Sequence, residues 1–160
     1  MQCKLDIELV PRSAWNQSLY NYFKNNKRII EWNKIKNDIF LSEGRKCWIC
    51  GAANSGLEAH EFWEYDETNG IQKLLAIHHL CSMCHKIKHI GFWGTEDGLK
   101  ILEKYNLSWE DIIKHFCRIN ECTIEDFQLH KKKAFEIWGG RNKLKWKQDF
   151  GKYQDIIKEK

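Results

Sequence analysis

Two C-x-x-C pairs, separated by 30 residues, constrain this chain more than any other feature of its sequence. The first pair is Cys47-Trp48-Ile49-Cys50 and the second is Cys81-Ser82-Met83-Cys84. Each pair can form a knuckle, a tight turn in which two thiolates and nearby backbone N–H groups converge on one metal ion. Four thiolates at this spacing match a closed, tetrahedral zinc site with no open position for catalysis. We therefore expect one structural Zn²⁺ ion bound by Cys47, Cys50, Cys81 and Cys84.

The other cysteines and the start of the sequence limit the class of protein. An odd total of seven cysteines, with two C-x-x-C pairs, favours metal binding in a reducing compartment over a disulfide framework. Cys3, Cys117 and Cys122 have no partner at metal-ligand spacing, and we expect them to pack as small apolar residues. The first residues lack the apolar segment of a secretory signal, and no apolar run approaches the roughly 18 residues of a membrane span. These features indicate a soluble, cytoplasmic protein without a membrane partner.

Length and patterning predict a single domain of the α+β class. At 160 residues the chain can bury a real core, and its 13% aromatic content argues against disorder. The pattern divides the domain into an N-terminal strand and helix, a zinc-bound centre, and a mainly helical remainder that carries a basic stripe. These parts are residues 1–44, 45–92 and 93–160.

Local patterns predict the elements of the two flanks. On the N-terminal side, apolar alternation predicts a strand at residues 4–10, and helical spacing predicts a helix at 27–42 that ends at Gly44. On the C-terminal side, the last helix should end near Gly139, and residues 144–150 should form a strand or an extended arm. Helix starts on this side are marked by three N-capping residues: Thr95, Ser108 and Thr123.

The centre should form a β-hairpin followed by a helix. Residues 57–65 and 71–80 are strand-like, and the turn between them ends at Gly70. The second strand leads directly to Cys81, and the residues from His85 onward contain no helix breaker. The two C-x-x-C pairs would therefore clamp two strands and a helix around one zinc ion.

Three of the histidines and one of the glutamates between and just after the cysteines are candidate site residues. His85 and His89 are four residues apart, so on a helix their rings share one face and can bind a second metal ion. In the preceding strand His60 and Glu61 are neighbours, and strand alternation points them to opposite faces. Both can serve one site only where the strand kinks, bulges or ends. Each histidine alone is typical of a surface or core residue, but together they predict a metal site beside the zinc.

These residues resemble the HNH, or ββα-metal, endonucleases whose hairpin and helix are held by two C-x-x-C knuckles. The resemblance covers about residues 45–92, and the flanking tryptophans also resemble uncharacterised bacterial and phage HNH-like proteins. It implies a zinc-stapled ββα-metal core with flanking helices, and a metal-dependent endonuclease that hydrolyses DNA phosphodiester bonds. The matching segments are Cys47-Trp-Ile-Cys50-Gly51, Leu57-Glu58-Ala59-His60-Glu61 and Leu80-Cys81-Ser-Met-Cys84-His85-Lys86-Ile-Lys88-His89.

The resemblance gives the helical histidines a role and leaves two alignments for the strand. His85 and His89 match ligands of the catalytic divalent ion, which we expect to be Mg²⁺, Mn²⁺, Ni²⁺ or Zn²⁺. If His60 matches the family's general base, Ala59 occupies a ligand position. If His60 matches the ligand instead, Glu61 replaces the base. We prefer His60 as the base, because imidazole accepts a proton near neutral pH.

Two departures from the family's pattern keep an alternative function open. Ala59 has no ligand atom, and Ala76 stands where the family usually has its central asparagine. The alternative is a catalytically inactive HNH-fold zinc module that binds nucleic acid or a partner protein, for example a phage-encoded inhibitor or regulator. His78 and His79 precede the third cysteine, and one of them can replace a lost ligand, although we favour a core or surface role.

Basic residues indicate how DNA would bind. The formal net charge of +4 does not by itself identify a nucleic-acid-binding protein. Local runs of lysine and arginine can neutralise phosphates, yet a charged run is equally typical of a solvated helix face. The sequence does not indicate an oligomeric state. The candidate DNA-binding residues are Lys86, Lys88, Lys131, Lys132, Lys133, Arg141, Lys143 and Lys145.

Overall fold

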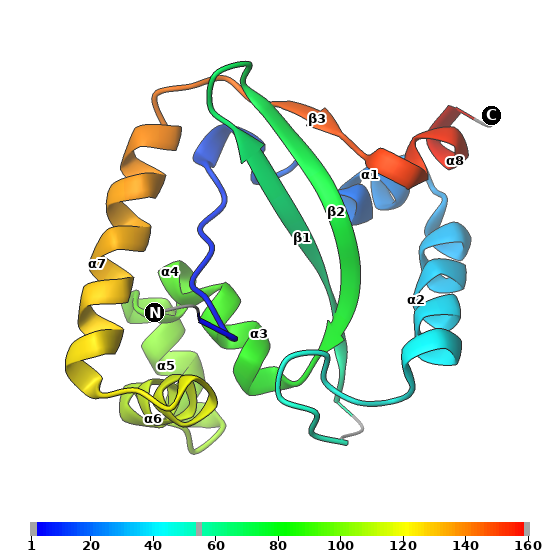
Figure 1. The fold of residues 1–160 in the computed structure, drawn as a ribbon. Coiled ribbons are helices and arrows are strands. Elements are labelled where there is room, and N and C mark those ends of the chain that lie inside the picture. The colour runs from blue at the N-terminus through cyan, green and yellow to red at the C-terminus, as the bar shows by residue number, and fades with distance from the viewer. Residues whose placement is uncertain (1–2, 54–55, 159–160) are drawn as a thin grey trace.

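A computed structural model describes residues 3–53 and 56–158 of the chain (Figure 1). The strands are β1 (Glu58–Asp66), β2 (Ile71–Leu80) and β3 (Lys147–Asp149). The helices are α1 (Leu19–Asn25), α2 (Ile29–Glu43), α3 (Ser82–Lys88), α4 (Ile90–Trp93), α5 (Glu96–Lys104), α6 (Trp109–Asn120), α7 (Ile124–Arg141) and α8 (Gln154–Lys158), with short 3-10 helices η1 (Arg12–Ala14) and η2 (Gly151–Tyr153). The predicted α+β class is confirmed.

A long hairpin forms the centre of the molecule. Strands β1 and β2 pair antiparallel, and β3 adds to the other side of β2 in parallel, so β1 is an edge strand. The register shifts between Phe62 and Trp63, which marks a bulge in β1. At the hairpin turn Gly70 has φ +65°, and a Cβ atom there would lie 2.7 Å from the carbonyl oxygen of Lys145. Only glycine fits this turn, because the segment before β3 crosses directly over it.

Two hydrophobic cores lie on opposite sides of the hairpin. Helices α3 to α7 gather on one side of it, and α1, α2 and α8 on the other (Figure 1). The first core, which we call the metal-side core, includes the buried cysteines together with Phe116 and Phe127. The second core packs Trp32 of α2 against Trp63 and Tyr65 of β1. The hairpin is therefore covered on both sides, and the helix that follows it is held in the metal-side core.

Most predicted elements form close to their expected positions. The helix expected at residues 27–42 is α2, and Gly44 ends it with φ +77°. All three predicted capping residues accept a hydrogen bond from the backbone N–H three residues later, and two of the three caps are reciprocal capping boxes. The extended arm expected near the C-terminus contains β3. No helix among the described residues is long and apolar enough to cross a membrane.

The strand predicted at residues 4–10 is wrong. Lys4 and Leu5 lie in a bend, and residues 6–10 have no strand partner among the described residues. Instead the amides of Lys4 and Leu5 donate to Oδ1 of Asn120, and the amide of Ile7 donates to Nε2 of His130. Apolar alternation shows which side chains are buried but not what buries them. Here the apolar side chains pack against helices α6 and α7, and side chains of these helices, in place of a neighbouring strand, accept the backbone hydrogen bonds.

Candidate metal centres

The four cysteines of the two C-x-x-C pairs form one cluster. Cys47 and Cys50 come from the loop after α2, whereas Cys81 caps α3 and Cys84 lies in its first turn. All four sulfur atoms lie within 4.8 Å of one another, and the sulfurs of Cys50 and Cys81 are 3.7 Å apart. Tetrahedral zinc with Zn–S bonds of about 2.3 Å requires sulfur–sulfur distances of about 3.8 Å. The cluster can therefore bind a structural metal ion such as zinc, with little change in geometry.

Burial and hydrogen bonding within the cluster favour a metal over free thiols. Cys47 is 1% exposed and Cys84 is fully buried. Hydrogen bonds from the thiols of Cys81 and Cys84 hold the pKa of Cys47 well below its ordinary value, while the pKa of Cys81 rises to about 11 because it shares a proton with Cys47. The four crowded thiols compete for shared protons. A divalent cation takes the place of these protons, because it binds all four sulfurs as thiolates.

His115 of α6 contacts this cluster, although its place in the sequence does not indicate a site residue. Its Nε2 lies 3.2 Å from the sulfur of Cys84, and its Nδ1 lies 3.1 Å from a guanidinium nitrogen of Arg118. Arginine can only donate, so Nδ1 accepts and Nε2 carries the proton that points at the sulfur. A hydrogen bond to a ligating thiolate orients that ligand and tunes the metal site. The signal is absent from the sequence, because only the packing of α6 on α3 brings the two residues together.

We expect His115→Ala to weaken metal retention at the four-cysteine cluster by about 10- to 100-fold, because it removes the hydrogen bond to Cys84. The measurement is competition of the zinc-loaded protein with a chromophoric chelator. His130→Ala is the matched control, since this half-buried histidine packs on the same core and contacts none of the four cysteines in the cluster. Equal zinc retention by wild type and His115→Ala would show that the contact is incidental.

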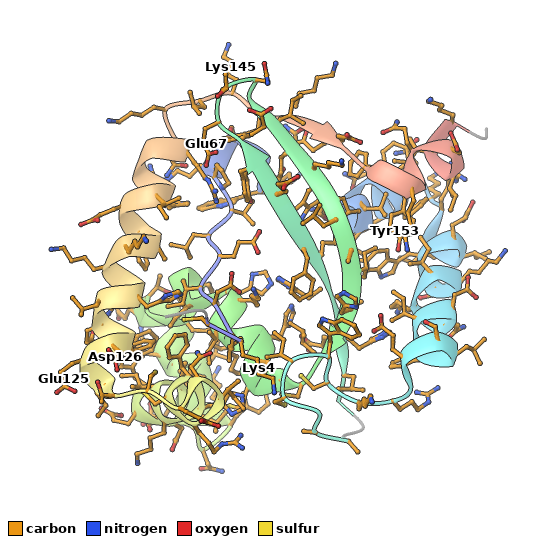
Figure 2. All side chains as sticks on the ribbon, in the orientation of Figure 1. Lys4, Glu67, Glu125, Asp126, Lys145 and Tyr153 are labelled. Carbon is orange, nitrogen blue, oxygen red and sulfur yellow. The ribbon has the colours of Figure 1, made fainter. Side chains whose placement is uncertain are left out.

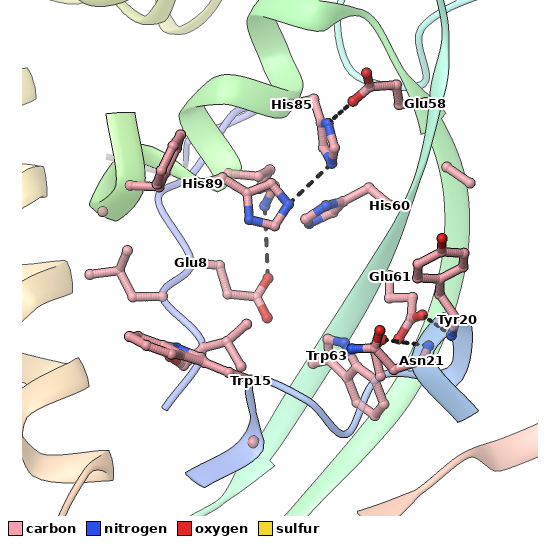
Figure 3. Close-up of a pocket in the computed structure, with 18 of the residues that line it drawn as sticks. Glu8, Trp15, Tyr20, Asn21, Glu58, His60, Glu61, Trp63, His85 and His89 are labelled. Carbon is pink, nitrogen blue, oxygen red and sulfur yellow. Dashed lines mark hydrogen bonds and ion pairs between the residues drawn. The ribbon is translucent and has the colours of Figure 1, made fainter. Parts of the chain in front are cut away.

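A second cluster consists of three histidines. His60 comes from β1, His85 lies in α3 and His89 ends α3, and a nitrogen of each lies within 4.8 Å of the others. The Nε2 atoms of His85 and His89 face each other at 3.1 Å. On its other side the Nδ1 of His85 contacts the carboxylate of Glu58, so Nδ1 carries the proton and Nε2 presents a lone pair (Figure 3). The Nε2 lone pair of His85 therefore faces the Nε2 of His89, where a cation can bind in place of a hydrogen bond between the two rings.

Loss of solvent around the rings favours the neutral form of these imidazoles, although His89 as a whole residue is exposed. The pKa of His60 lies well below its ordinary value, first because the ring is buried and then because it faces the other two histidines. Burial also lowers the pKa of His85, and it lowers that of His89 to about 4. Neutral imidazoles are the form that binds metal, and three of them suit Zn²⁺, Ni²⁺ or Co²⁺ better than Mg²⁺. The donor set therefore fits a divalent ion that keeps an open coordination position.

Glu61 is held away from the three histidines. Its carboxylate accepts hydrogen bonds from the backbone amides of Leu19 and Tyr20, at 3.0 and 2.9 Å (Figure 3). The bulge in β1 lies beyond Glu61, so it does not turn this side chain toward His60. Burial raises the pKa of Glu61, while the two amides oppose that shift. Its observed contacts make it an anchor for the start of α1, where a carboxylate is favourable.

The two histidines before the third cysteine do not join either cluster. His78 pairs through Nδ1 with Glu43 at 2.7 Å and stacks on Trp48. His79 is 2% exposed and stacks on Phe40 of α2. Both histidines therefore take the core and surface positions that the sequence analysis favoured for them.

A cavity of about 1080 Å³ opens in front of the three histidines. It extends around the edge strand β1, so both His60 and Glu61 line it, together with Glu8 from the N-terminal segment. The carboxylate of Glu8 lies 3.8 Å from the ammonium group of Lys88, and its other oxygen is buried without a hydrogen-bond partner among the described residues. Burial raises the pKa of Glu8 to about 7, although Lys88 opposes this shift. Glu8 is not predictable as a site residue from the sequence, because only the fold brings this segment to the hairpin.

The predicted DNA-binding residues do not form one surface around the histidines. Lys88 is 3% exposed and pairs with Asp6 and Glu8, so its ammonium group is taken up by carboxylates of the N-terminal segment. Arg141 bonds to Glu67 and stacks on Tyr65.

The remaining candidates divide between two places. Lys86 lies on α3, the helix that carries His85 and His89. There it contacts Ser82 and lies over the ring of Trp93. Figure 2 shows Lys145 beside Glu67 at the hairpin tip, and Asp126 at the opposite end of α7. The exposed candidates therefore follow α7 and continue to the hairpin tip: they are Lys132, Lys133, Lys143 and Lys145, with Lys131 half-buried over Trp109.

Comparisons with protein-family models, curated proteins and solved structures gave no match for this chain. What the described residues define is an α+β protein with a four-cysteine cluster that can bind a structural metal ion, and with a three-histidine cluster that could hold another. The resemblance to HNH endonucleases remains a prediction from the sequence.

Proposed function

We propose that this protein is a metal-dependent, HNH-like endonuclease that hydrolyses phosphodiester bonds in DNA. The observation that carries the proposal is the meeting of His60 from the hairpin with His85 and His89 from the helix, at the mouth of one cavity. The resemblance assigned both helical histidines to a catalytic ion. The adjoining cysteine cluster supports the proposal, because a bound zinc ion would fix the helix against the hairpin.

The geometry favours one of the two alignments that the sequence left open. The ring of His60 lies among the other two imidazoles, so we assign it as the third ligand of a divalent ion and not as the base. Glu58 orients His85 through its Nδ1, as carboxylates commonly do for metal-binding histidines. A divalent ion bound there would supply an acidified water and would stabilise charge on the phosphate.

Glu8 is the best candidate for the proton acceptor. In the second alignment Glu61 occupies the base position, but two backbone amides hold its carboxylate. Glu8 lines the same cavity as the histidines, and its pKa of about 7 suits a group that takes up a proton near neutral pH. Lys88 holds its carboxylate in place from one side.

Cleavage of supercoiled plasmid by the zinc-loaded protein tests the proposal. With Ni²⁺, Co²⁺, Mn²⁺ or Mg²⁺ added in turn, we expect nicked or linear product with at least one of them. Glu8→Gln should slow cleavage by about 10²- to 10⁴-fold, the usual contribution of a proton acceptor. DNA binding without cleavage under any metal would contradict the proposal and favour the inactive module that Ala59 and Ala76 suggest.

A further inference from the structure

Exposed aromatic side chains line the cavity in front of the three histidines. Trp15 is 58% exposed, Phe92 47%, and Tyr20 and Phe135 each 39%. They come from four separate parts of the chain: the segment before α1, α1 itself, α4 and α7. Apolar surface gathered in one concave place, with polar groups around it, marks a binding site more often than chance exposure does.

Part of this wall is rigid before any ligand binds. The indole N–H groups of Trp15 and Trp138 both donate to the carbonyl oxygen of Val10, at 2.8 and 3.0 Å. The guanidinium of Arg12 lies over the ring of Trp138, 4.9 Å from its centre. Two indoles fixed on one backbone atom lose little freedom when a ligand stacks on them, so they form a preorganised platform.

The charges around the cavity suit a ligand that combines flat rings with phosphate. Arg12 and Lys36 line it as cations, and neither is fully buried. Its buried carboxylates are restrained, because Glu8 pairs with Lys88 and Glu61 accepts from the amides at the start of α1. An ion on the three histidines would add positive charge at one end. An apolar peptide or lipid would use the aromatic wall but would have no use for these cations.

We propose that the aromatic wall binds the unpaired bases of single-stranded DNA, so that the site acts on single strands or frayed ends in preference to intact duplex. This inference rests on the proposed function and names its substrate. Stacking requires exposed base faces, which a closed duplex keeps covered by its own base pairs. A cavity lined by rings from several elements can accept splayed bases beside the three histidines, whereas a rigid duplex presents only its sugar-phosphate backbone to the cavity.

The test measures the binding of a fluorescein-labelled, 12-nucleotide single-stranded DNA to zinc-loaded protein, by anisotropy and without added divalent ions. We expect the single strand to bind at least about tenfold more tightly than a duplex of the same sequence. Trp15→Ala and Phe135→Ala should each weaken single-strand binding by about 5- to 150-fold, the range that loss of one base-stacking contact gives. Tyr105→Ala is the control, because Tyr105 is 70% exposed and does not line the cavity.

Equal affinity for single strand and duplex would overturn the inference, and so would unchanged binding by both cavity variants. Thermal unfolding of each variant separates lost contacts from lost fold. Cleavage of the plasmid and of the single-stranded DNA, both with added divalent ions, is scored separately, so the two proposals fail independently. A protein that cuts duplex plasmid without preferring single strands contradicts only the inference, and one that prefers single strands but cuts no DNA contradicts only the proposed function.

Discussion

Cys84→Ser is expected to cost the protein most of its stability. The free energy of zinc binding by four-ligand structural sites is about 10–16 kcal/mol, which is as large as the whole stability of a typical domain, about 5–15 kcal/mol. Cys84 is fully buried in the metal-side core, where its sulfur meets the other three. We therefore expect loss of bound zinc and loss of a cooperative thermal transition, measured by elemental analysis and circular dichroism.

The matched control is Cys117→Ser. Cys117 is a half-buried cysteine that also packs on the metal-side core, but it lies outside the four-cysteine cluster. This variant should keep one zinc ion per chain and unfold within a few degrees of wild type. If Cys84→Ser kept a wild-type transition, the cluster would not be the structural centre that its geometry indicates.

The second large effect concerns cleavage. Under the proposed function His85→Ala removes one of three metal ligands, whose Nε2 faces His89, and two imidazoles alone would hold a divalent ion poorly. We expect plasmid cleavage to fall by about 10³-fold or more, equivalent to about 4 kcal/mol of lost transition-state stabilisation. Zinc content and thermal midpoint should stay close to wild type, because His85 is not part of the cysteine cluster.

His78→Ala serves as the control for this effect. His78 is a half-buried histidine in strand β2, paired with Glu43 and outside both clusters. Its loss should leave the cleavage rate within a few-fold of wild type. Cleavage by His85→Ala at the wild-type rate would mean that the three histidines do not hold the working ion.

The sequence was informative wherever function depends on spacing along the chain. The C-x-x-C pairs, the hairpin arms on either side of Gly70, and the i, i+4 spacing of His85 and His89 all follow from local periodicity. Capping signals such as Ser108 are equally local, since the side chain bonds to a backbone group three residues away. These features therefore appear in the structure where the sequence places them.

Features that depend on contacts between distant segments were not predictable. His115 meets Cys84 only because α6 packs on α3, and Glu8 reaches the cavity only because the N-terminal segment binds α6 and α7. The anchoring of Glu61 by α1 joins residues about 40 positions apart. The alternation of residues 4–10 was misread as a strand for the same reason, since a period of two does not reveal what provides the burial.

Calorimetric titration of the zinc-loaded protein with Ni²⁺ or Co²⁺ tests the central claim most directly. The claim is that His60, His85 and His89 form a metal site separate from the cysteine cluster. We expect one equivalent of ion to bind to wild type and to His78→Ala, and none to bind at comparable affinity to His85→Ala. Absence of binding to wild type, or undiminished binding to a variant in which all three histidines are alanine, would contradict the claim.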